Sequence, residues 1–119
     1  MAIRVPASGD LEEARSRVEP YVHRTPVVTS RNIDSIAGST LFFKCENFQR
    51  VGAFKYRGAT NAVFSLSDEE ARRGVATHSS GNHAQALALA ARTRGIRSYI
   101  VMPTSSPDVK INAVRRYGA

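Results

Sequence analysis

The sequence contains one cysteine, no tryptophan and no long apolar segment. The single thiol, Cys45, excludes an intramolecular disulfide and a cysteine cluster for a metal ion, and its place in the apolar segment 41–45 predicts a reduced, buried side chain. No apolar segment has the length of a secretory signal or of a membrane span, so we expect a cytoplasmic protein with no membrane partner. The three histidines lack the spacing of zinc ligands, and no metal site is predicted.

Acidic residues are scarce relative to basic ones: ten against seventeen, which gives a net charge of +7. A charge of this sign raises nucleic acid as a partner. The basic residues are, however, spread along the whole chain, without a basic segment that contains interleaved aromatic residues. We therefore expect no nucleic-acid partner, and salt-sensitive retention on DNA that survives moderate ionic strength would be needed to support one.

Hydrophobic periodicity, turn residues and capping residues predict helices that alternate with strands. The expected helices are a segment between Ser8 and Pro20, residues 32–36 after Ser30, residues 53–66, a short helix between Ser67 and Gly74, residues 84–94, and residues 108–117 after Ser106 and Pro107. The expected strands are residues 27–29, 41–45, 75–77 and a buried strand at 99–102. This alternation predicts an α/β fold with parallel strand pairing. Because the last strand needs a neighbour on each side, we expect the chain to be the N-terminal portion, or a truncated product, of a longer protein.

Lys55 is one of only three lysines and lies where a helix is expected to begin. An aromatic neighbour, Phe54, and the positive end of a helix dipole both disfavour the ammonium form of a lysine. An amine in that setting is a nucleophile for Schiff-base chemistry. The alternative is a lysine whose stem packs on Phe54 while its ammonium group reaches water.

A second polar segment follows the expected strand 75–77 and leads into the helix 84–94. It consists of Ser79, Ser80, Gly81, Asn82 and His83. In a strand–turn–helix arrangement with a glycine in the turn, the free backbone N–H groups at the start of the helix point at an anion. This turn therefore predicts a site for a carboxylate or a phosphate. The alternative is an ordinary helix cap, in which Ser79, Ser80 or Asn82 bonds the first amides of the helix.

Together the two segments resemble the fold-type II pyridoxal-phosphate enzymes, and most closely the serine/threonine dehydratases and serine racemases. The matching residues are Phe54-Lys55-Tyr56-Arg57-Gly58-Ala59 and Ser79-Ser80-Gly81-Asn82-His83-Ala84-Gln85, supported by Arg24-Thr25-Pro26, Lys44-Cys45-Glu46-Asn47-Phe48-Gln49 and Val101-Met102-Pro103. They occur in the family's order and cover nearly the whole chain from Arg24 onward. The resemblance implies an incomplete three-layer parallel-sheet fold of the tryptophan synthase β-like class, in which residues 1–65 begin the large domain and residues 66–119 form part of the small domain.

The resemblance also implies a role for each residue of the two motifs. Lys55 attaches pyridoxal phosphate as a Schiff base and then acts as the base on the substrate Cα proton, Phe54 packs against the cofactor ring, and Asn82 bonds its phenolic oxygen. The residues implied around the substrate carboxylate are Ser79, Ser80, Gly81, Asn82 and His83. In racemase-like members, Ser80 is the second acid/base group. The implied reaction is the α,β-elimination of L-serine or L-threonine to a 2-oxo acid and ammonia, by an enzyme that is a homo-oligomer when complete.

Two features depart from the family pattern. Ala53 stands where many relatives carry a serine, and the eight glycines never form a cluster, so no glycine-rich loop can wrap a phosphate. We therefore expect this stretch to be inactive by itself. Serine racemisation or a β-replacement reaction on the same fold is an alternative, and a non-catalytic interaction or regulatory protein is an alternative of another class.

Overall fold

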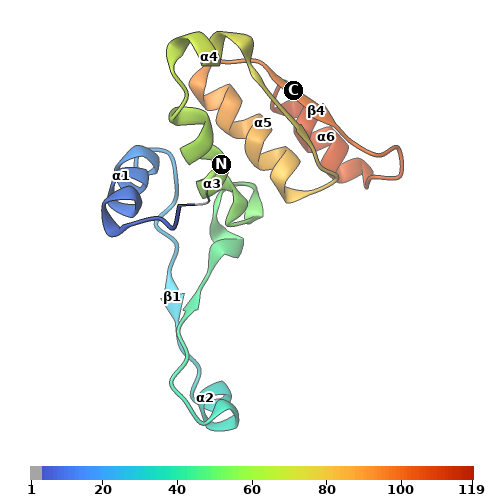
Figure 1. Cartoon of the computed structure of the whole chain (residues 1–119). Helices are drawn as coiled ribbons and strands as arrows, with labels where there is room; N and C mark the ends of the chain where they lie inside the picture. Colours follow the sequence, from blue (N-terminus) through green and yellow to red (C-terminus); the bar gives the residue numbers. More distant parts are fainter. Residues whose placement is uncertain (1–3) are drawn as a thin grey trace.

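A computed structural model describes residues 4–119 as a helical body from which a long arm projects (Figure 1). The elements of the body are α1 (Ser8–Val18), α3 (Lys55–Phe64), α4 (Asp68–Arg73), β3 (Val75–His78), α5 (Asn82–Arg94), β4 (Ser98–Val101) and α6 (Asp108–Arg116). Those of the arm are β1 (Val27–Val28), α2 (Arg31–Ala37) and β2 (Phe43–Lys44). Two short 3-10 turns, η1 (Glu46–Phe48) and η2 (Arg50–Gly52), lead from the arm back to α3. None of the helices within these residues has the length and apolar character that a bilayer crossing requires.

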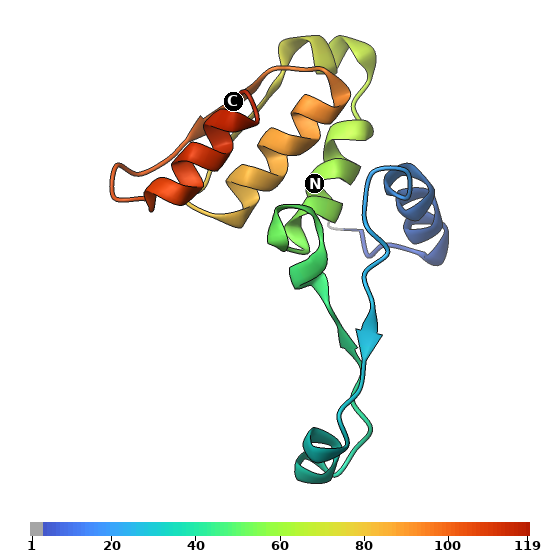
Figure 2. The ribbon, with the colours of Figure 1, turned by 180° about the vertical axis from the view of Figure 1, so that it is seen from behind.

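The strands of the body form a parallel pair, in which Val75 lies opposite Ser98 and His78 lies opposite Val101. Helix α5 connects the two strands and packs against both, as expected for a crossover between parallel strands. Figure 2 shows α3, α5 and α6 side by side. The expected α/β fold and its parallel pairing are confirmed for this part of the chain.

Helix α5 is the centre of the core, because its alanines let neighbouring helices approach closely. The buried residues of its contact with α3 are Tyr56, Ala59 and Val63 on one side and Ala86, Leu87 and Ala90 on the other. Val114 of α6 packs on Ala84 and Ala88 of α5. This packing holds the start of α3 and the turn before α5 in one rigid unit.

The arm pairs its strands antiparallel over two residues each, Val27 with Lys44 and Val28 with Phe43. The expectation of a five-residue strand at 41–45 in a parallel sheet is therefore wrong. The exposed apolar residues of the arm are Val27, Val28, Ile33, Ile36, Phe42 and Phe43. Because much of their surface is exposed, these β-branched and aromatic residues gain little from an extended conformation.

Burial and capping differ from the sequence-based expectations at several further positions. Cys45 is half-buried rather than buried. Tyr99 and Val101 of β4 are exposed, because α5 covers only one face of the strand pair. Ser8, Ser30 and Ser106 make no capping hydrogen bond: Ser8 lies inside α1, Ser30 is the N-cap of α2 without a side-chain bond, and α6 is preceded by Pro107.

Candidate active site

Helix α3 begins at Lys55, and the backbone before it passes through two left-handed residues. Val51 and Gly52 have φ angles of 56° and 66°. Glycine adopts this conformation freely, whereas for the β-branched valine it costs on the order of 1–3 kcal/mol. The turn buries Ala53 and Tyr56 and leaves Lys55 exposed. Two buried neighbours therefore hold the backbone while the amine points outward.

The Lys55 Nζ lies 5.3 Å from the centroid of the Phe54 ring, which is a cation–π distance. Both side chains are exposed. Burial therefore does not desolvate the amine, and the expectation of a desolvated lysine is wrong for this chain. The contact matches the alternative of a lysine packed on its aromatic neighbour, and it leaves the amine accessible to a ligand.

An open cleft of about 500 Å³ adjoins Lys55, within the size range of small-molecule sites. Its lining comes from residues 54–66, which run along α3, and from β3 and α5: Phe54, Lys55, Gly58, Ala59, Ala62, Val63, Leu66, Val75, Ala76, His83 and Leu87. Most of these side chains are apolar, and the ionisable ones are Lys55 and His83. The structure thus brings Phe54, Lys55 and His83 to one cleft.

The turn from β3 to α5 presents backbone amides at the N-terminus of a 13-residue helix. The N-cap of α5 is Gly81, and no side chain caps the helix. The Ser79 hydroxyl instead accepts a hydrogen bond from the Gly81 N–H, at 3.3 Å. The N–H groups of Asn82, His83 and Ala84 have no acceptor within residues 4–119. The alternative of an ordinary side-chain cap is therefore wrong, and the geometry is that of an anion-binding helix end.

The other predicted site residues lie on this turn but not on the lining of the cleft. Ser80 and Asn82 are exposed, whereas Ser79 and Gly81 are half-buried. They border the cleft only through the neighbouring His83. The structure therefore places the two predicted motifs next to each other without bringing every side chain to the amine.

Lys110 reaches the same turn from α6, and no local pattern in the sequence indicates this contact. Its Nζ lies 3.4 Å from the point where a Cβ on Gly81 would sit. Val114, one helical turn further along α6, packs on Ala84 of α5. This packing carries Lys110 to the helix end, where its charge adds to that of the free amides.

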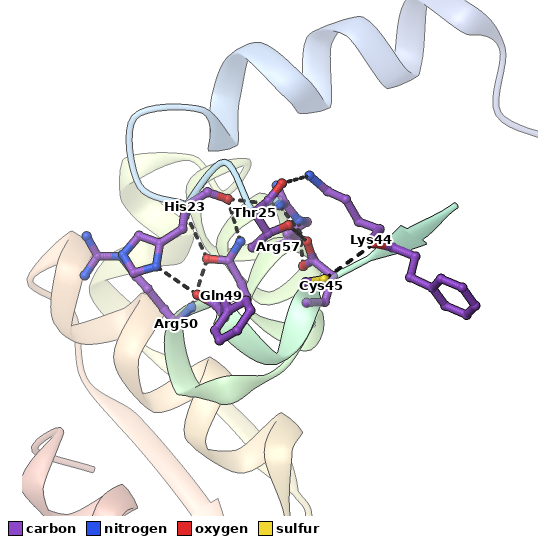
Figure 3. Close-up of polar contacts among 10 residues, drawn as sticks. His23, Thr25, Lys44, Cys45, Gln49, Arg50 and Arg57 are labelled. Carbon is purple, nitrogen blue, oxygen red and sulfur yellow. Dashed lines mark hydrogen bonds and ion pairs between the residues drawn. The ribbon is translucent and has the colours of Figure 1, made fainter. Parts of the chain in front are cut away.

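Sequence reasoning also missed a group of polar contacts that includes His23, Thr25 and Arg57 (Figure 3). Arg57 donates two hydrogen bonds to the Glu46 carboxylate, from Nε at 2.9 Å and from Nη2 at 2.8 Å. Its Nη2 also donates to the carbonyl oxygen of His23, at 3.0 Å. The Thr25 hydroxyl donates to the same carboxylate, at 2.6 Å. These bonds join η1, α3 and the segment before the arm.

The side chain of Gln49 joins the same segments and is buried. Its Nε2 donates to the His23 carbonyl oxygen at 2.9 Å, and its Oε1 accepts from the backbone N–H groups of His23 and Arg50, each at 2.9 Å. Both lone pairs of the Gln49 side-chain oxygen, and one of the two N–H groups of its amide nitrogen, are thus hydrogen-bonded.

The charges of this group shift one another's ionisation. The hydrogen bond from Arg57 lowers the pKa of Glu46 from 4.5 to about 2, and the Thr25 hydroxyl and the charge of Lys44 add to this effect, while burial opposes it. Glu46 in turn raises the pKa of Arg57. The ion pair is therefore charged on both sides at any pH near neutrality.

Comparisons with known proteins place this geometry in context. The family model described as "Pyridoxal-phosphate dependent enzyme" matches residues 18–119. Serine racemase of Oryza sativa subsp. indica is 59% identical over 108 residues, which are 91% of this chain and 32% of that protein. The β-hydroxyaspartate dehydratase of Paracoccus denitrificans is 54% identical over 114 residues, 96% of this chain and 36% of that protein. The structure of maize serine racemase matches with a TM-score of 0.87 and 56% identity, over 92% of this chain and 33% of that one. The chain spans about a third of the length of the curated relatives it matches.

Proposed function

Because the chain belongs to the family of pyridoxal-phosphate dependent enzymes, with part of their type II fold, we propose that it forms the lysine-bearing part of an ammonia-lyase for L-serine or L-threonine. The reaction removes the Cα proton and the β-hydroxyl group and yields a 2-oxo acid and ammonia. One arrangement carries the proposal: the amine of Lys55 and the first turn of α5 border the same cleft. A nucleophilic amine beside an anion-binding helix end suits a substrate whose carboxylate is attached to the reacting carbon.

The residues around the cleft fit the ring and the aldehyde of pyridoxal phosphate. Lys55 supplies a primary amine, Phe54 an aromatic face and α3 an apolar wall. We assign to Asn82 the hydrogen bond to the phenolic oxygen of the ring. The phosphate has no comparable match within residues 4–119, because the glycines near the cleft are isolated in the sequence. We assign phosphate binding to another part of the complete enzyme.

The residues around the cleft have defined tasks in this proposal. Bound pyridoxal phosphate withdraws electrons from the substrate Cα and makes its proton acidic. The Lys55 Nζ accepts that proton. The backbone amides of Asn82 and His83, together with the Ser79 hydroxyl, bind the substrate carboxylate and orient the Cα–H bond toward the amine. The apolar side chains of α3 limit the access of water to this side of the cleft.

Racemisation is the second candidate, and it is favoured by the exposed hydroxyl of Ser80 and by the identity to serine racemases. In this reaction Ser80 donates a proton to the opposite face of Cα. Ser80→Ala in the complete enzyme should then lower D-serine formation by about 10²-fold and ammonia release by less than about threefold. Ser79→Ala, which alters the carboxylate turn, should lower both activities together. Equal loss of both in Ser80→Ala would contradict this role.

We further propose that the complete enzyme is a cytoplasmic homo-oligomer that uses a free amino acid and has no nucleic-acid partner. The scattered positions of the basic residues and the exposed apolar surface of the arm support this assignment.

Borohydride reduction of the chain after incubation with pyridoxal phosphate, followed by peptide mapping, tests the proposed function. Borohydride makes the attachment of the cofactor to a lysine permanent, and only three lysines compete for it. We expect label on Lys55, with Lys44 and Lys110 near background, and no such label in Lys55→Ala. Equal labelling of the three lysines, or no labelling, would overturn the proposal that the residues of this chain assemble a site for the aldehyde of pyridoxal phosphate.

A further inference from the structure

We infer that Arg57 and Glu46 are positioning residues for Lys55: their ion pair closes the loop that precedes the lysine and so fixes where its amine meets the cleft. The inference rests on the proposed function of Lys55. It concerns side chains that do not line the cleft and that act only through the backbone.

The ion pair ties the first turn of α3 to η1 and to the segment before the arm. Arg57 follows Lys55 by two residues and makes three hydrogen bonds, two to Glu46 and one to the His23 carbonyl oxygen. The Glu46 side chain is 18% exposed and that of Arg57 33%, so water screens the pair only in part. A bidentate arginine–carboxylate pair has a narrow range of favourable geometries. The first turn of α3 is therefore held in one place relative to His23.

Gln49 fixes the other end of the same loop, because its side chain bonds to the same atom as that of Arg57, the carbonyl oxygen of His23. The Gln49 Nε2 and the Arg57 Nη2 both donate to the carbonyl oxygen of His23, at 2.9 and 3.0 Å. The loop from Gln49 to Arg57 is thus closed at both ends. It contains Val51 in a left-handed conformation, which persists only where the surrounding structure over-determines it. The ion pair supplies part of that restraint.

Lys55 has no comparable restraint of its own. It is exposed, and the cation–π contact with Phe54 at 5.3 Å is between adjacent residues. The position of its amine therefore depends on the backbone that the loop delivers. A displacement of about 1 Å at a reacting group can cost about 10²-fold in rate, so a distant restraint of this kind affects the chemistry.

The ion pair of Arg73 with Glu69 offers a matched control. Its N–O distance is 2.8 Å, as in the pair of Arg57 with Glu46. Both of its residues, however, lie four apart on α4 and are exposed. It closes no loop, and a pair of this kind contributes little to stability.

The labelling experiment tests the inference with variants of these pairs: Arg57→Met, Glu46→Gln, Arg57→Lys and the control Arg73→Met. Label on Lys110, which lies outside the loop, measures the background of nonspecific labelling. We expect the ratio of label on Lys55 to label on Lys110 to fall about tenfold in Arg57→Met and in Glu46→Gln. This ratio should fall less in Arg57→Lys, because a lysine keeps the charge but not the bidentate geometry. Arg73→Met should match the wild type, and the amide exchange of α5 reports on any general loss of stability.

Amide hydrogen exchange provides a measurement that does not involve the cofactor. The N–H groups of Gly52 and Arg57 bond within the loop, to the carbonyl oxygens of Gln49 at 2.8 Å and of Phe54 at 3.0 Å. In Arg57→Met we expect both to exchange about tenfold faster, with the amides of α5 unchanged.

The two measurements separate failure of the inference from failure of the proposed function. Selective label on Lys55 in the wild type, with the same ratio in Arg57→Met, would overturn the inference alone. Absence of selective label in the wild type would overturn the proposed function. Faster exchange in Arg57→Met would then still support the loop restraint, and unchanged exchange would overturn that as well.

Discussion

At the scale of single residues, the exposed amine of Lys55 depends on partners that it does not touch. Ala53 and Tyr56 are buried on either side of it and anchor the backbone. Glu46 and Arg57 close the loop behind it. The amine remains free for a ligand because other residues do the anchoring, and a site residue can in this way be both exposed and well placed.

Glu46→Gln should cause a loss of stability that depends on pH. The pKa of Glu46 is lowered from 4.5 to about 2 in the folded chain. The ionised carboxylate therefore stabilises the fold above about pH 4.5, and this contribution disappears as the pH falls toward 2. Because both partners are partly exposed, we expect a difference in free energy of unfolding of about 2 kcal/mol at pH 7 and below about 0.5 kcal/mol at pH 2.

Urea unfolding of the wild type and of Glu46→Gln, followed by circular dichroism at low micromolar concentration, measures both values. Glu69→Gln is the control, since its ion pair lies on the surface of α4. It should change stability by less than about 0.5 kcal/mol at either pH. A Glu46→Gln effect of equal size at pH 7 and pH 2 would show that the lost interaction is not the charge.

The proximity of the two motifs was predictable because each motif is a contiguous segment beside an expected helix. The two motifs around Lys55 and Gly81 are short segments, and the structure places them beside one cleft. The partners of Arg57 lie 11 and 34 residues away, so no local pattern reveals them. The expectation of a desolvated Lys55 failed for the same reason, because burial depends on segments that are distant in sequence.

At the scale of the elements, α4 shows that local signals suffice when both partners lie within one turn. The Ser67 hydroxyl accepts a hydrogen bond from the Glu70 N–H at 3.3 Å, and the Glu70 carboxylate accepts one from the Ser67 N–H at 2.8 Å. This is the capping box that the sequence predicts. Gly74 then ends the helix, as expected, and the chain enters β3 directly.

Ser67→Ala should remove this cap and destabilise the chain by about 1 kcal/mol, because the Glu70 N–H loses its acceptor. Ser65→Ala is the matched control: the Ser65 hydroxyl donates to the Ala62 carbonyl oxygen on the surface, and its loss should cost less than about 0.5 kcal/mol. Urea unfolding of the two variants measures both losses of stability as shifts of the unfolding midpoint. Indistinguishable midpoints would mean that the box does not stabilise α4.

The strands were less predictable than the helices, since a strand depends on neighbours that the local sequence does not contain. Within the expected strand 41–45, only Phe43 and Lys44 pair with another strand, opposite Val28 and Val27 of β1. The strand expected at 99–102 does form, as β4, but Tyr99 and Val101 are exposed. Pairing and burial in sheets come from cross-strand contacts, whereas a helix satisfies its backbone within one segment.

At the scale of the whole molecule, a packed body carries an arm with no core of its own. The alanine-rich face of α5 gives the body its close packing. The arm extends away from it and ends in the short helix α2 (Figure 1). Its apolar side chains are largely exposed, and exposed apolar surface of this kind marks an interaction site.

We therefore expect this chain to self-associate through the arm at tens of micromolar. Ile36 and Phe42 are 88% and 72% exposed, and the unpaired edges of β1 and β2 offer backbone groups to a second chain. The double variant Ile36→Lys with Phe42→Lys should stay monomeric in sedimentation velocity at concentrations where the wild type forms larger species. Val109→Lys is the control, because Val109 is 69% exposed but lies alone on α6. A wild-type chain that is monomeric at all concentrations, or an equal effect of Val109→Lys, would show that the arm is not the associating surface.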